Sequence, residues 1–313
     1  MKTILITGAA GFIGSGLTDR LIERGDTVVG VDEFNDYYDP RLKRANLAGA
    51  MACPRFSLHE LDICDEAGLR TAFDAARPDV VVHLAARAGV RPSLKDPCLY
   101  HRVNVIGSQH VLDACRDYGP SHLVFASSSS VYGGCTDVPF RETLPVDRPI
   151  SPYAATKRMN ELMGHVYSHV YGLNVTMLRF FTVYGPRQRP DMAIHTFAEL
   201  IEAGKPVPMF GDGSTARDYT YIDDILDGVV KAIDKPFRFE IFNLGESRTT
   251  TLRELIGLVA QALGKSARIE QFPLQPGDVE ITCADIAKAK AMLGYNPQIA
   301  IEEGLRRFAE SRR

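Results

Sequence analysis

Short apolar runs rich in β-branched residues alternate along the chain with longer segments whose apolar residues recur at helical spacing. Six runs are almost continuously hydrophobic, as strands buried on both faces of a parallel sheet are; they read TILIT, TVVGVD, DVVVHLA, HLVFASS, NVTMLRFF and EIFNLG. Helical patterns occupy residues 12–24, 66–76, 102–118, 153–171 and 222–234. This alternation predicts an α/β fold with a doubly wound parallel sheet.

The texture of the sequence changes after residue 185. The stretches YGPRQRPDM, GKPVPMFGDGS and FPLQPGD are rich in Pro and Gly and predict loops around short elements. A chain of 313 residues is also longer than one hydrophobic core usually needs. We therefore expect a larger domain from residues 1–185, continued by 217–250, and a smaller, interleaved C-terminal α/β domain from 186–216 and 251–313.

The composition, with 45% hydrophobic and 24% charged residues, is that of a globular protein. A net charge of −3 gives no indication of a nucleic-acid surface or a polybasic membrane patch. Six scattered cysteines without a CxxC pair favour reduced thiols. No apolar run is long enough for a signal peptide or a membrane span. We expect a cytoplasmic protein that binds neither nucleic acid nor membranes.

A glycine-rich segment, GAAGFIG, connects the first predicted strand to the first predicted helix. It places Gly8, Gly11 and Gly14 at the turn, where small residues let the backbone approach a pyrophosphate near the helix N-terminus. Glycines also serve tight turns that bind nothing, so the motif alone is weak evidence. The strand before it and the helix after it favour a dinucleotide site of the Rossmann type.

Asp32 ends the second predicted strand, TVVGVD, where a carboxylate accepts hydrogen bonds from an adenosine ribose. Glu33 follows it, and neither neighbour is Arg or Lys. A 2′-phosphate would meet two negative charges, so we expect NAD rather than NADP. The alternative is an acid that is only solvated at the end of a strand.

Tyr153 and Lys157 lie four residues apart near the start of a predicted helix, SPYAATKRMNELMG, which Ser151 and Pro152 are suited to begin. A nearby ammonium favours the phenolate form of a tyrosine. Such a phenolate can accept a proton from a sugar hydroxyl while hydride leaves the same carbon. An ordinary helix face carrying Tyr and Lys is the alternative, and a non-catalytic dinucleotide sensor would usually lack one of the two.

Together GAAGFIG, SSSSVYG and YAATK resemble the extended short-chain dehydrogenase/reductase family, and within it the nucleotide-sugar epimerases. The similarity runs over nearly the whole chain. FFTVYGP, FNDYYDP and QPGDV resemble the UDP-glucuronate 4-epimerase branch. The resemblance implies a Rossmann domain that binds NAD, a smaller domain that binds a UDP-sugar, and a homodimer.

The resemblance also implies roles for individual residues. The catalytic residues would be Tyr153, Lys157 and Ser128. The cofactor contacts would be Gly8, Gly11, Phe12, Ile13, Gly14, Asp32, Asn35, Asp62, Ile63, Leu84, Ala85, Ala86, Asn104, Ser127, Tyr153 and Lys157. The substrate contacts would be Arg91, Ser128, Ser129, Ser130, Thr182, Arg189, Phe210, Arg217 and Asp278.

Four serines, Ser127 to Ser130, stand at the end of the predicted strand HLVFASS. In related dehydratases and decarboxylases the pattern has Glu, sometimes after Asp, where Ser129 and Ser130 stand. Serine hydroxyls orient a substrate but do not act as bases near neutral pH. Hydroxyls alone suit oxidation at C4 to a 4-keto sugar and reduction on its other face, which is 4-epimerisation.

The substrate expected from the resemblance is UDP-glucuronate, converted to UDP-galacturonate. Arg189, or else Arg187, would pair bidentately with the C6 carboxylate, although both could be exposed loop charges. Thr182 stands where UDP-glucose 4-epimerases commonly have Asn. Glu33 stands where the family often has Asn, and Arg87 stands where it often has Gln. Because these departures bear on the choice of substrate, two alternatives stay open: a UDP-glucose/UDP-galactose 4-epimerase and a UDP-glucuronate decarboxylase.

Two further patterns concern metals and assembly. His165 and His169 have metal-binding spacing, but no third ligand is evident, so we expect no metal site. The helices 102–118 and 153–171 carry apolar faces that are either core or the dimer interface implied by the resemblance. These faces are formed by Val111, Leu112 and Cys115, and by Leu162, Val166 and Val170.

Overall fold

The computed structural model describes residues 1–274 and 279–312, and the chain divides into two compact units. The first comprises Met1–Gly133, Pro145–Arg179 and Leu226–Phe242, and the second comprises Gly134–Leu144, Phe180–Ile225 and Asn243–Arg313. Each unit is therefore assembled from three segments that are distant in the sequence.

A seven-stranded sheet with the order β11-β6-β5-β4-β1-β2-β3 is the centre of the first unit. Its strands are β1 (Thr3–Thr7), β2 (Thr27–Asp32), β3 (Phe56–Glu60), β4 (Val80–His83), β5 (His122–Ser128), β6 (Val175–Phe180) and β11 (Phe239–Leu244). The pairs β1–β2, β2–β3, β1–β4 and β4–β5 are parallel. Every residue of β4 and β5 is buried, as expected for central strands covered on both faces.

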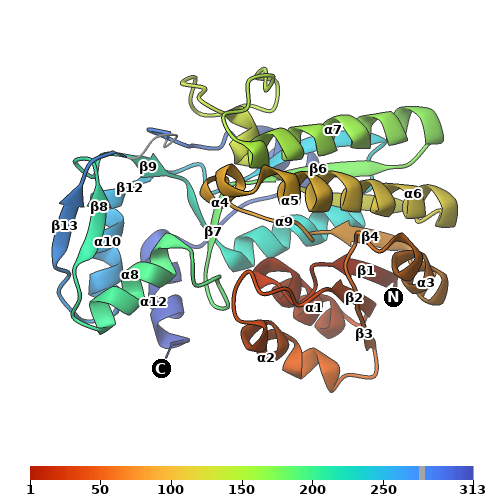
Figure 1. Cartoon of the computed structure of the whole chain (residues 1–313), viewed down its shortest axis with the longest axis horizontal. Helices are drawn as coiled ribbons and strands as arrows, with labels where there is room; N and C mark the ends of the chain where they lie inside the picture. Colours follow the sequence, from red (N-terminus) through yellow and green to blue (C-terminus); the bar gives the residue numbers. More distant parts are fainter. Residues whose placement is uncertain (275–278, 313) are drawn as a thin grey trace. The chain divides into compact units, whose positions relative to one another are not determined.

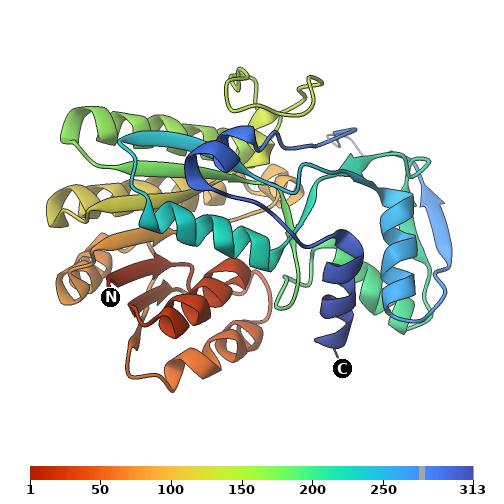
Figure 2. The same cartoon turned by 180° about the vertical axis from the view of Figure 1, so that it is seen from behind.

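Helices cover both faces of this sheet. They are α1 (Phe12–Arg24), α2 (Pro40–Met51), α3 (Glu66–Ala76), α4 (Val90–Lys95), α5 (Pro97–His101), α6 (Ser108–Tyr118), α7 (Pro152–Tyr171) and α9 (Ile222–Asp234). On one face, helix α6 packs against both α3 and α7 (Figure 1). On the other face α1 lies beside α9 (Figure 2), so closely that a side chain at Gly16 would meet Leu226.

The predicted doubly wound α/β sheet is confirmed, and three helices have the predicted bounds, 12–24, 66–76 and 222–234. The predicted helix 102–118 is interrupted, since a π-helical turn at Arg102–Gly107 precedes α6. The edge strand β3 was not predicted because its half-exposed sequence FSLHE is not continuously apolar and alternates only over its first four residues.

The second unit contains short strand pairs and helices. Its strands are β7 (Thr182–Tyr184), β8 (Val207–Phe210), β9 (Ala216–Arg217), β10 (Tyr219–Tyr221), β12 (Thr250–Thr251) and β13 (Ile269–Phe272). They pair as β7–β10 and β8–β13 in parallel and as β9–β12 antiparallel. Its helices are α8 (Ala193–Glu202), α10 (Leu252–Ala262), α11 (Ala287–Leu293) and α12 (Ile301–Glu310).

Within residues 1–274 and 279–312, no helix combines the length and the apolar character that crossing a membrane requires.

Candidate active site

The glycine-rich turn between β1 and α1 is closed by backbone contacts that exclude side chains. Gly8 has a φ of +73°, and a Cβ there would lie 2.8 Å from the backbone nitrogen of Ala85. A Cβ on Gly14 would lie 2.0 Å from the carbonyl oxygen of Gly8. Glycine is therefore required at position 8 by conformation and by space, and at position 14 by space. The bare turn precedes the first N–H groups of α1, which suits an approaching pyrophosphate.

Asp32 ends β2 beside this turn, and its carboxylate is held by the main chain. Oδ2 accepts from the N–H of Ala10 at 3.0 Å, and Oδ1 accepts from that of Phe34 at 2.9 Å. Burial raises the pKa of Asp32 above its ordinary value, while the Phe34 N–H and the charge of Lys43 oppose the shift. Each oxygen retains capacity for a second donor, which a ribose hydroxyl can supply.

The two residues that depart from the family pattern contact each other. Arg87 Nη2 lies 3.8 Å from Glu33 Oε1, and Glu33 also accepts from the amide of Asn35. Lys43 Nζ donates to Asn35 Oδ1 at 2.9 Å and to its carbonyl oxygen at 2.8 Å. The unexpected Arg87 thus balances the unexpected Glu33, which directly follows the predicted ribose acid in the chain.

Asn104 connects the segment after β4 to helix α7. Its Oδ1 accepts from the N–H of Arg87 at 2.7 Å, and its Nδ2 donates to the Arg87 carbonyl at 2.9 Å. Nδ2 also lies 3.1 Å from Thr156 Oγ1. The preceding Leu84 and Ala85 are bonded through their N–H groups to Thr7 of β1.

The other predicted cofactor contacts also belong to the first unit. Asp62 accepts from the N–H of Cys64 at 2.9 Å, and Ile63 is 4% exposed. Phe12 and Ile13 are half-buried at the start of α1, and Ala86 is half-buried in the segment after β4.

Helix α7 begins as its sequence predicts. Ser151 Oγ accepts from the N–H of Ala154 at 3.1 Å, and Pro152 occupies the first turn. Tyr153 is half-buried, and its ring meets that of Tyr100 edge-on with centroids 6.2 Å apart. The cap and this ring contact fix the start of the helix that carries Tyr153 and Lys157.

Lys157 is a buried cation one helical turn after Tyr153. Its Nζ donates to the carbonyl oxygen of Ala126 on β5 at 2.7 Å, and only 3% of the residue is exposed. Burial lowers the pKa of Lys157 to about 8, while the charge of Glu161 opposes the shift. The ammonium is therefore mostly protonated at pH 7 and points at the strand that ends in the serines.

The serines after Ser127 form a closed turn. Ser128 Oγ donates to Ser130 Oγ at 3.1 Å and accepts from the Ser130 N–H at 3.2 Å. Ser129 and Ser130 are half-buried on the 3₁₀ turn Ser129–Tyr132, which follows β5. These three hydroxyls offer hydrogen bonds at the strand end without adding an acid.

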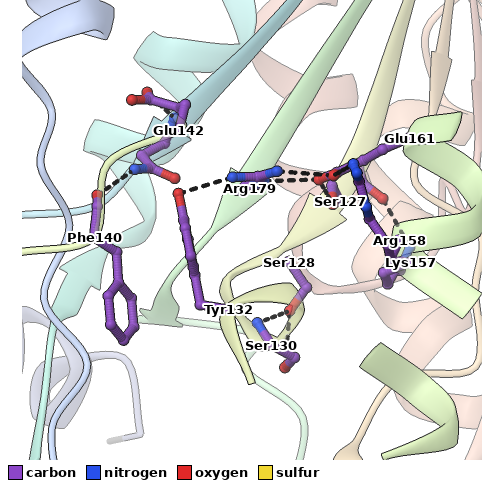
Figure 3. A network of polar contacts seen from close by, with 12 residues as sticks. Ser127, Ser128, Ser130, Tyr132, Phe140, Glu142, Lys157, Arg158, Glu161 and Arg179 are labelled. Atoms are coloured by element: carbon purple, nitrogen blue, oxygen red, sulfur yellow. Dashed lines mark hydrogen bonds and ion pairs between the residues drawn. The ribbon is translucent and has the colours of Figure 1, made fainter. Parts of the chain in front are cut away.

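Ser127 belongs to a buried network instead (Figure 3). Its Oγ donates to Glu161 Oε1 at 2.7 Å, and Arg179 donates to Oε1 through Nε at 2.8 Å and to Oε2 through Nη2 at 2.9 Å. Arg158 Nη1 donates to Oε2 at 3.2 Å, and Arg179 Nη1 donates to Tyr132 OH at 3.0 Å. The strand end thus has an acid directly beneath it, but that acid is fully occupied.

Sequence reasoning missed Glu161 and Arg179. The available signal was the spacing of Tyr153, Lys157 and Glu161, which places all three on one face of α7. Arg179, in the apolar run VTMLRF of β6, is 1% exposed, and a buried charge there requires a partner.

The second unit holds the substrate residues predicted from loops. Thr182 starts β7, and its N–H donates to the carbonyl oxygen of Asp218 at 3.1 Å. Phe210 ends β8, with its ring 5.9 Å from that of Phe272. Arg217 Nη1 donates to the carbonyl oxygen of Ala216 at 2.9 Å. The predicted contact Asp278 lies outside the described residues, and Arg91 is exposed on α4 of the first unit.

Arg189 already has a carboxylate partner. Its Nε donates to Asp191 Oδ1 and its Nη2 to Asp191 Oδ2, both at 2.8 Å. Arg187, the other predicted carboxylate contact, is exposed with a φ of +65°. Arg189 thus forms the bidentate contact that a carboxylate ligand would need, and in this structure its partner is Asp191.

The two histidines of α7 stack on each other. The ring centroids of His165 and His169 are 6.2 Å apart, and Phe239 meets His165 edge-on. His83 on β4 is bonded to Thr7 Oγ1 and Ser108 Oγ, and burial lowers its pKa to about 3. Among the described residues, no group of three or more His, Cys, Asp or Glu is arranged to hold a metal ion.

Comparison with known proteins agrees with this geometry. Residues 4–245 match the model of the NAD dependent epimerase/dehydratase family. The chain is 44% identical over 308 residues to UDP-glucuronate 4-epimerase of Thermodesulfobacterium geofontis, covering 98% of this chain and 95% of that protein. The family resemblance predicted from the motifs is confirmed.

Solved structures are similar as well. The crystal structure of UDP-glucuronic acid 4-epimerase from Bacillus cereus with UDP-glucuronic acid and NAD has a TM-score of 0.92 at 37% identity, with 98% of both chains covered. The structure of UDP-glucose 4-epimerase with UDP-glucose from Thermotoga maritima has a TM-score of 0.91 at 36% identity, with 98% of this chain and 97% of that one covered.

Proposed function

The chain belongs to the NAD dependent epimerase/dehydratase family, and from that premise we propose that it inverts C4 of UDP-glucuronate to give UDP-galacturonate. One observation carries the choice of chemistry. The strand end beside the Lys157 ammonium presents hydroxyls, and the acid beneath it, Glu161, is held by Arg179, Arg158 and Ser127. At this strand end the described residues place hydroxyls, and no available acid, where dehydration or proton removal at C5 would need a base.

The cofactor of the proposed reaction is NAD, and the first unit fits it. The bare turn at Gly8 and Gly14 would receive the pyrophosphate, and Asp32 would receive the adenosine ribose. Glu33 beside Asp32 disfavours a 2′-phosphate. When bound, NAD would supply reversible hydride transfer at C4, and this turn and Asp32 would hold the cofactor for it.

Tyr153 is the proposed acid and base. The protonated Lys157 favours the phenolate form of a tyrosine one helical turn away. That phenolate takes the proton of the C4 hydroxyl as the carbonyl forms, and returns it when the carbonyl is reduced. Ser128 would bond the same hydroxyl and hold it toward Tyr153, since a hydroxyl both donates and accepts.

The second unit is proposed to hold the UDP-sugar. Phe210 would stack on uracil, Arg217 would bond the diphosphate, and Thr182 and Arg189 would contact the sugar. Arg189 would exchange Asp191 for the C6 carboxylate, since both are bidentate acceptors of one guanidinium. Holding that carboxylate also restrains the 4-keto sugar, a β-keto acid, from losing CO₂.

A UDP-glucose/UDP-galactose 4-epimerase is the second candidate. The Arg189–Asp191 pair favours it, because an arginine that is already paired within the protein does not need a substrate carboxylate. The similarity to the Thermotoga maritima enzyme is nearly as high as that to the Bacillus cereus enzyme.

The deciding experiment incubates the purified protein with UDP-glucuronate, UDP-glucose and UDP-xylose separately. Configuration at C4 is measured by NMR, and CO₂ release is measured alongside. We expect UDP-galacturonate from the first substrate and no CO₂, with Tyr153→Phe as the inactive control. UDP-galactose from UDP-glucose alone would establish the second candidate, and CO₂ from UDP-glucuronate would establish a decarboxylase.

The protein is proposed to act as a cytoplasmic homodimer. Helix α7 exposes an apolar row in which Met159, Leu162, Val166 and Val170 are 48%, 52%, 49% and 60% exposed. Of the two interpretations left open for Val111, Leu112 and Cys115, the structure shows the core: each residue is 0% exposed in the first unit. All six cysteines are free, which supports a reducing compartment.

Light scattering of Leu162→Glu tests the dimer. The parent is expected at twice the 34.5 kDa chain mass and the variant at the chain mass. Lys95→Glu, on the exposed end of α4, is the matched control and should stay dimeric.

A further inference from the structure

Glu161 is a carboxylate whose four acceptor positions are all taken. Oε1 accepts from Ser127 and from Arg179, and Oε2 accepts from Arg179 and from Arg158. Its side chain is 0% exposed, and that of Arg179 is 1% exposed. A carboxylate whose acceptor positions are all filled in this way has no free lone pair with which to take a proton from a substrate.

The contacts of Glu161 join three elements beside the serine turn (Figure 3). Ser127 belongs to β5, Arg179 to β6 and Glu161 to α7. Arg179 also contacts Tyr132. The centroid of the Tyr132 ring lies 4.8 Å from the guanidinium carbon, and the Tyr132 hydroxyl accepts a hydrogen bond from Arg179 Nη1. Tyr132 closes the short turn that carries Ser129 and Ser130. The segment between Ser127 and Tyr132 is therefore fixed at both ends through one ion pair.

Glu161 also lies one helical turn after Lys157, on the face that carries Tyr153. Burial lowers the pKa of Lys157 to about 8, and the charge of Glu161 is what opposes this shift. His83 of β4, whose pKa burial and the charge of Lys157 lower to about 3, is neutral and does not replace that charge. Arg179 of β6 and Arg158 of α7, which contact Glu161, are themselves cations.

We propose that Glu161 is a positioning residue for the reaction, acting in two ways. It clamps the Ser127–Ser128 end of β5 to α7, and it supplies the negative charge that keeps the Lys157 ammonium protonated beside Tyr153. The proposal rests on the proposed function only for the consequence on turnover, because the state of Lys157 is a property of the protein alone.

The first measurement follows Lys157 without substrate. Protein labelled with ¹³C at lysine Cε is titrated by NMR, and the Lys157 signal is assigned by its absence in Lys157→Met. In Glu161→Gln we expect the titration midpoint of Lys157 to lie at least one pH unit below that of the parent protein. Asp147→Asn is the matched control, because it removes an exposed carboxylate that faces the same Arg158 at 3.5 Å. It should leave the midpoint unchanged.

A double variant separates positioning from folding. Glu161→Gln leaves Arg179 buried without its anion and can unfold the protein, whereas Glu161→Gln with Arg179→Met removes both charges at similar volume. We expect the double variant to melt near the parent yet keep the lowered Lys157 midpoint. An unchanged midpoint in the folded double variant would overturn the proposal.

Turnover supplies the last readout. In the double variant the alkaline limb of the pH dependence of kcat should move to lower pH. The size of this shift should equal that of the shift in the Lys157 titration midpoint. A uniformly lower kcat with an unmoved limb would show a merely structural residue. If the parent turns over no UDP-sugar, the proposed function fails while the Lys157 titration still decides the role of Glu161.

Discussion

Two arginine–carboxylate pairs with almost the same geometry lie in different surroundings. Arg179 grips Glu161 through two nitrogens, and Arg189 grips Asp191 in the same way. In the first pair 1% and 0% of the side chains are exposed, whereas in the second 19% and 43% are exposed. Water stabilises the second pair when it opens but not the first. The buried pair is thus suited to fix a structure, and the exposed pair to exchange partners.

Glu161→Ala breaks the buried pair and should have the largest effect. Burial alone would lower the pKa of Arg179, but the hydrogen bonds and charge of Glu161 hold it above its usual value. The variant leaves that cation unpaired, so the free energy of unfolding should fall by about 3–5 kcal/mol. Urea unfolding measures it, and Asp191→Ala serves as the exposed counterpart. Equal losses in both variants would refute the comparison.

The buried Lys157 should make the stability of the protein depend on pH. Its folded pKa of about 8 lies below the ordinary value of 10.5, so the unfolded chain binds more protons between these limits. The parent should therefore gain stability as pH rises from 8 to 10.5, by up to about 3 kcal/mol at about 1.4 kcal/mol per unit. Lys157→Met should lack this gain, and parallel pH curves for the two proteins would contradict the prediction.

Arg189→Ala tests the exchange proposed for the exposed pair. A charge-assisted contact contributes about 1.5–3 kcal/mol, so KM for UDP-glucuronate should rise roughly tenfold to a hundredfold. Turnover should slow, and some product should be decarboxylated. UDP-glucose has no carboxylate and provides the internal control. A variant that epimerises UDP-glucuronate as the parent does would exclude Arg189 from the site.

Asp191→Asn should have the smallest effect on stability, within about 0.5 kcal/mol, because exposed pairs contribute little. It removes the carboxylate that competes for Arg189, so KM for UDP-glucuronate should fall. An increased KM would mean that Asp191 orients Arg189 rather than competes with the substrate.

The sequence predicted the parts of the fold that depend on one periodic pattern. Strands such as TILIT and HLVFASS were predicted because central parallel strands are apolar throughout, and the 222–234 helix because one of its faces is apolar. The strand β3 was missed because its alternation covers only four residues, and the π-helical turn at Arg102–Gly107 was missed because apolar periodicity does not distinguish it from an α-helix.

The residues of the candidate site likewise include some that the sequence predicted and some that it did not. Tyr153 and Lys157 were predicted from spacing within one helix. The Glu161–Arg179 pair was not, because its partners come from α7 and β6 and meet only after the sheet forms. The Asp191 partner of Arg189 was overlooked for another reason: a pair two residues apart in a Pro-rich loop depends on backbone geometry that composition does not encode.

The Lys157 ammonium is anchored to the main-chain oxygen of residue 126. No substitution at that position can delete a carbonyl group, so an engineer can vary the side chain there and leave the lysine tethered. Retuning the proton chemistry of this enzyme would therefore have to act on the helix that carries the lysine rather than on the strand that receives it.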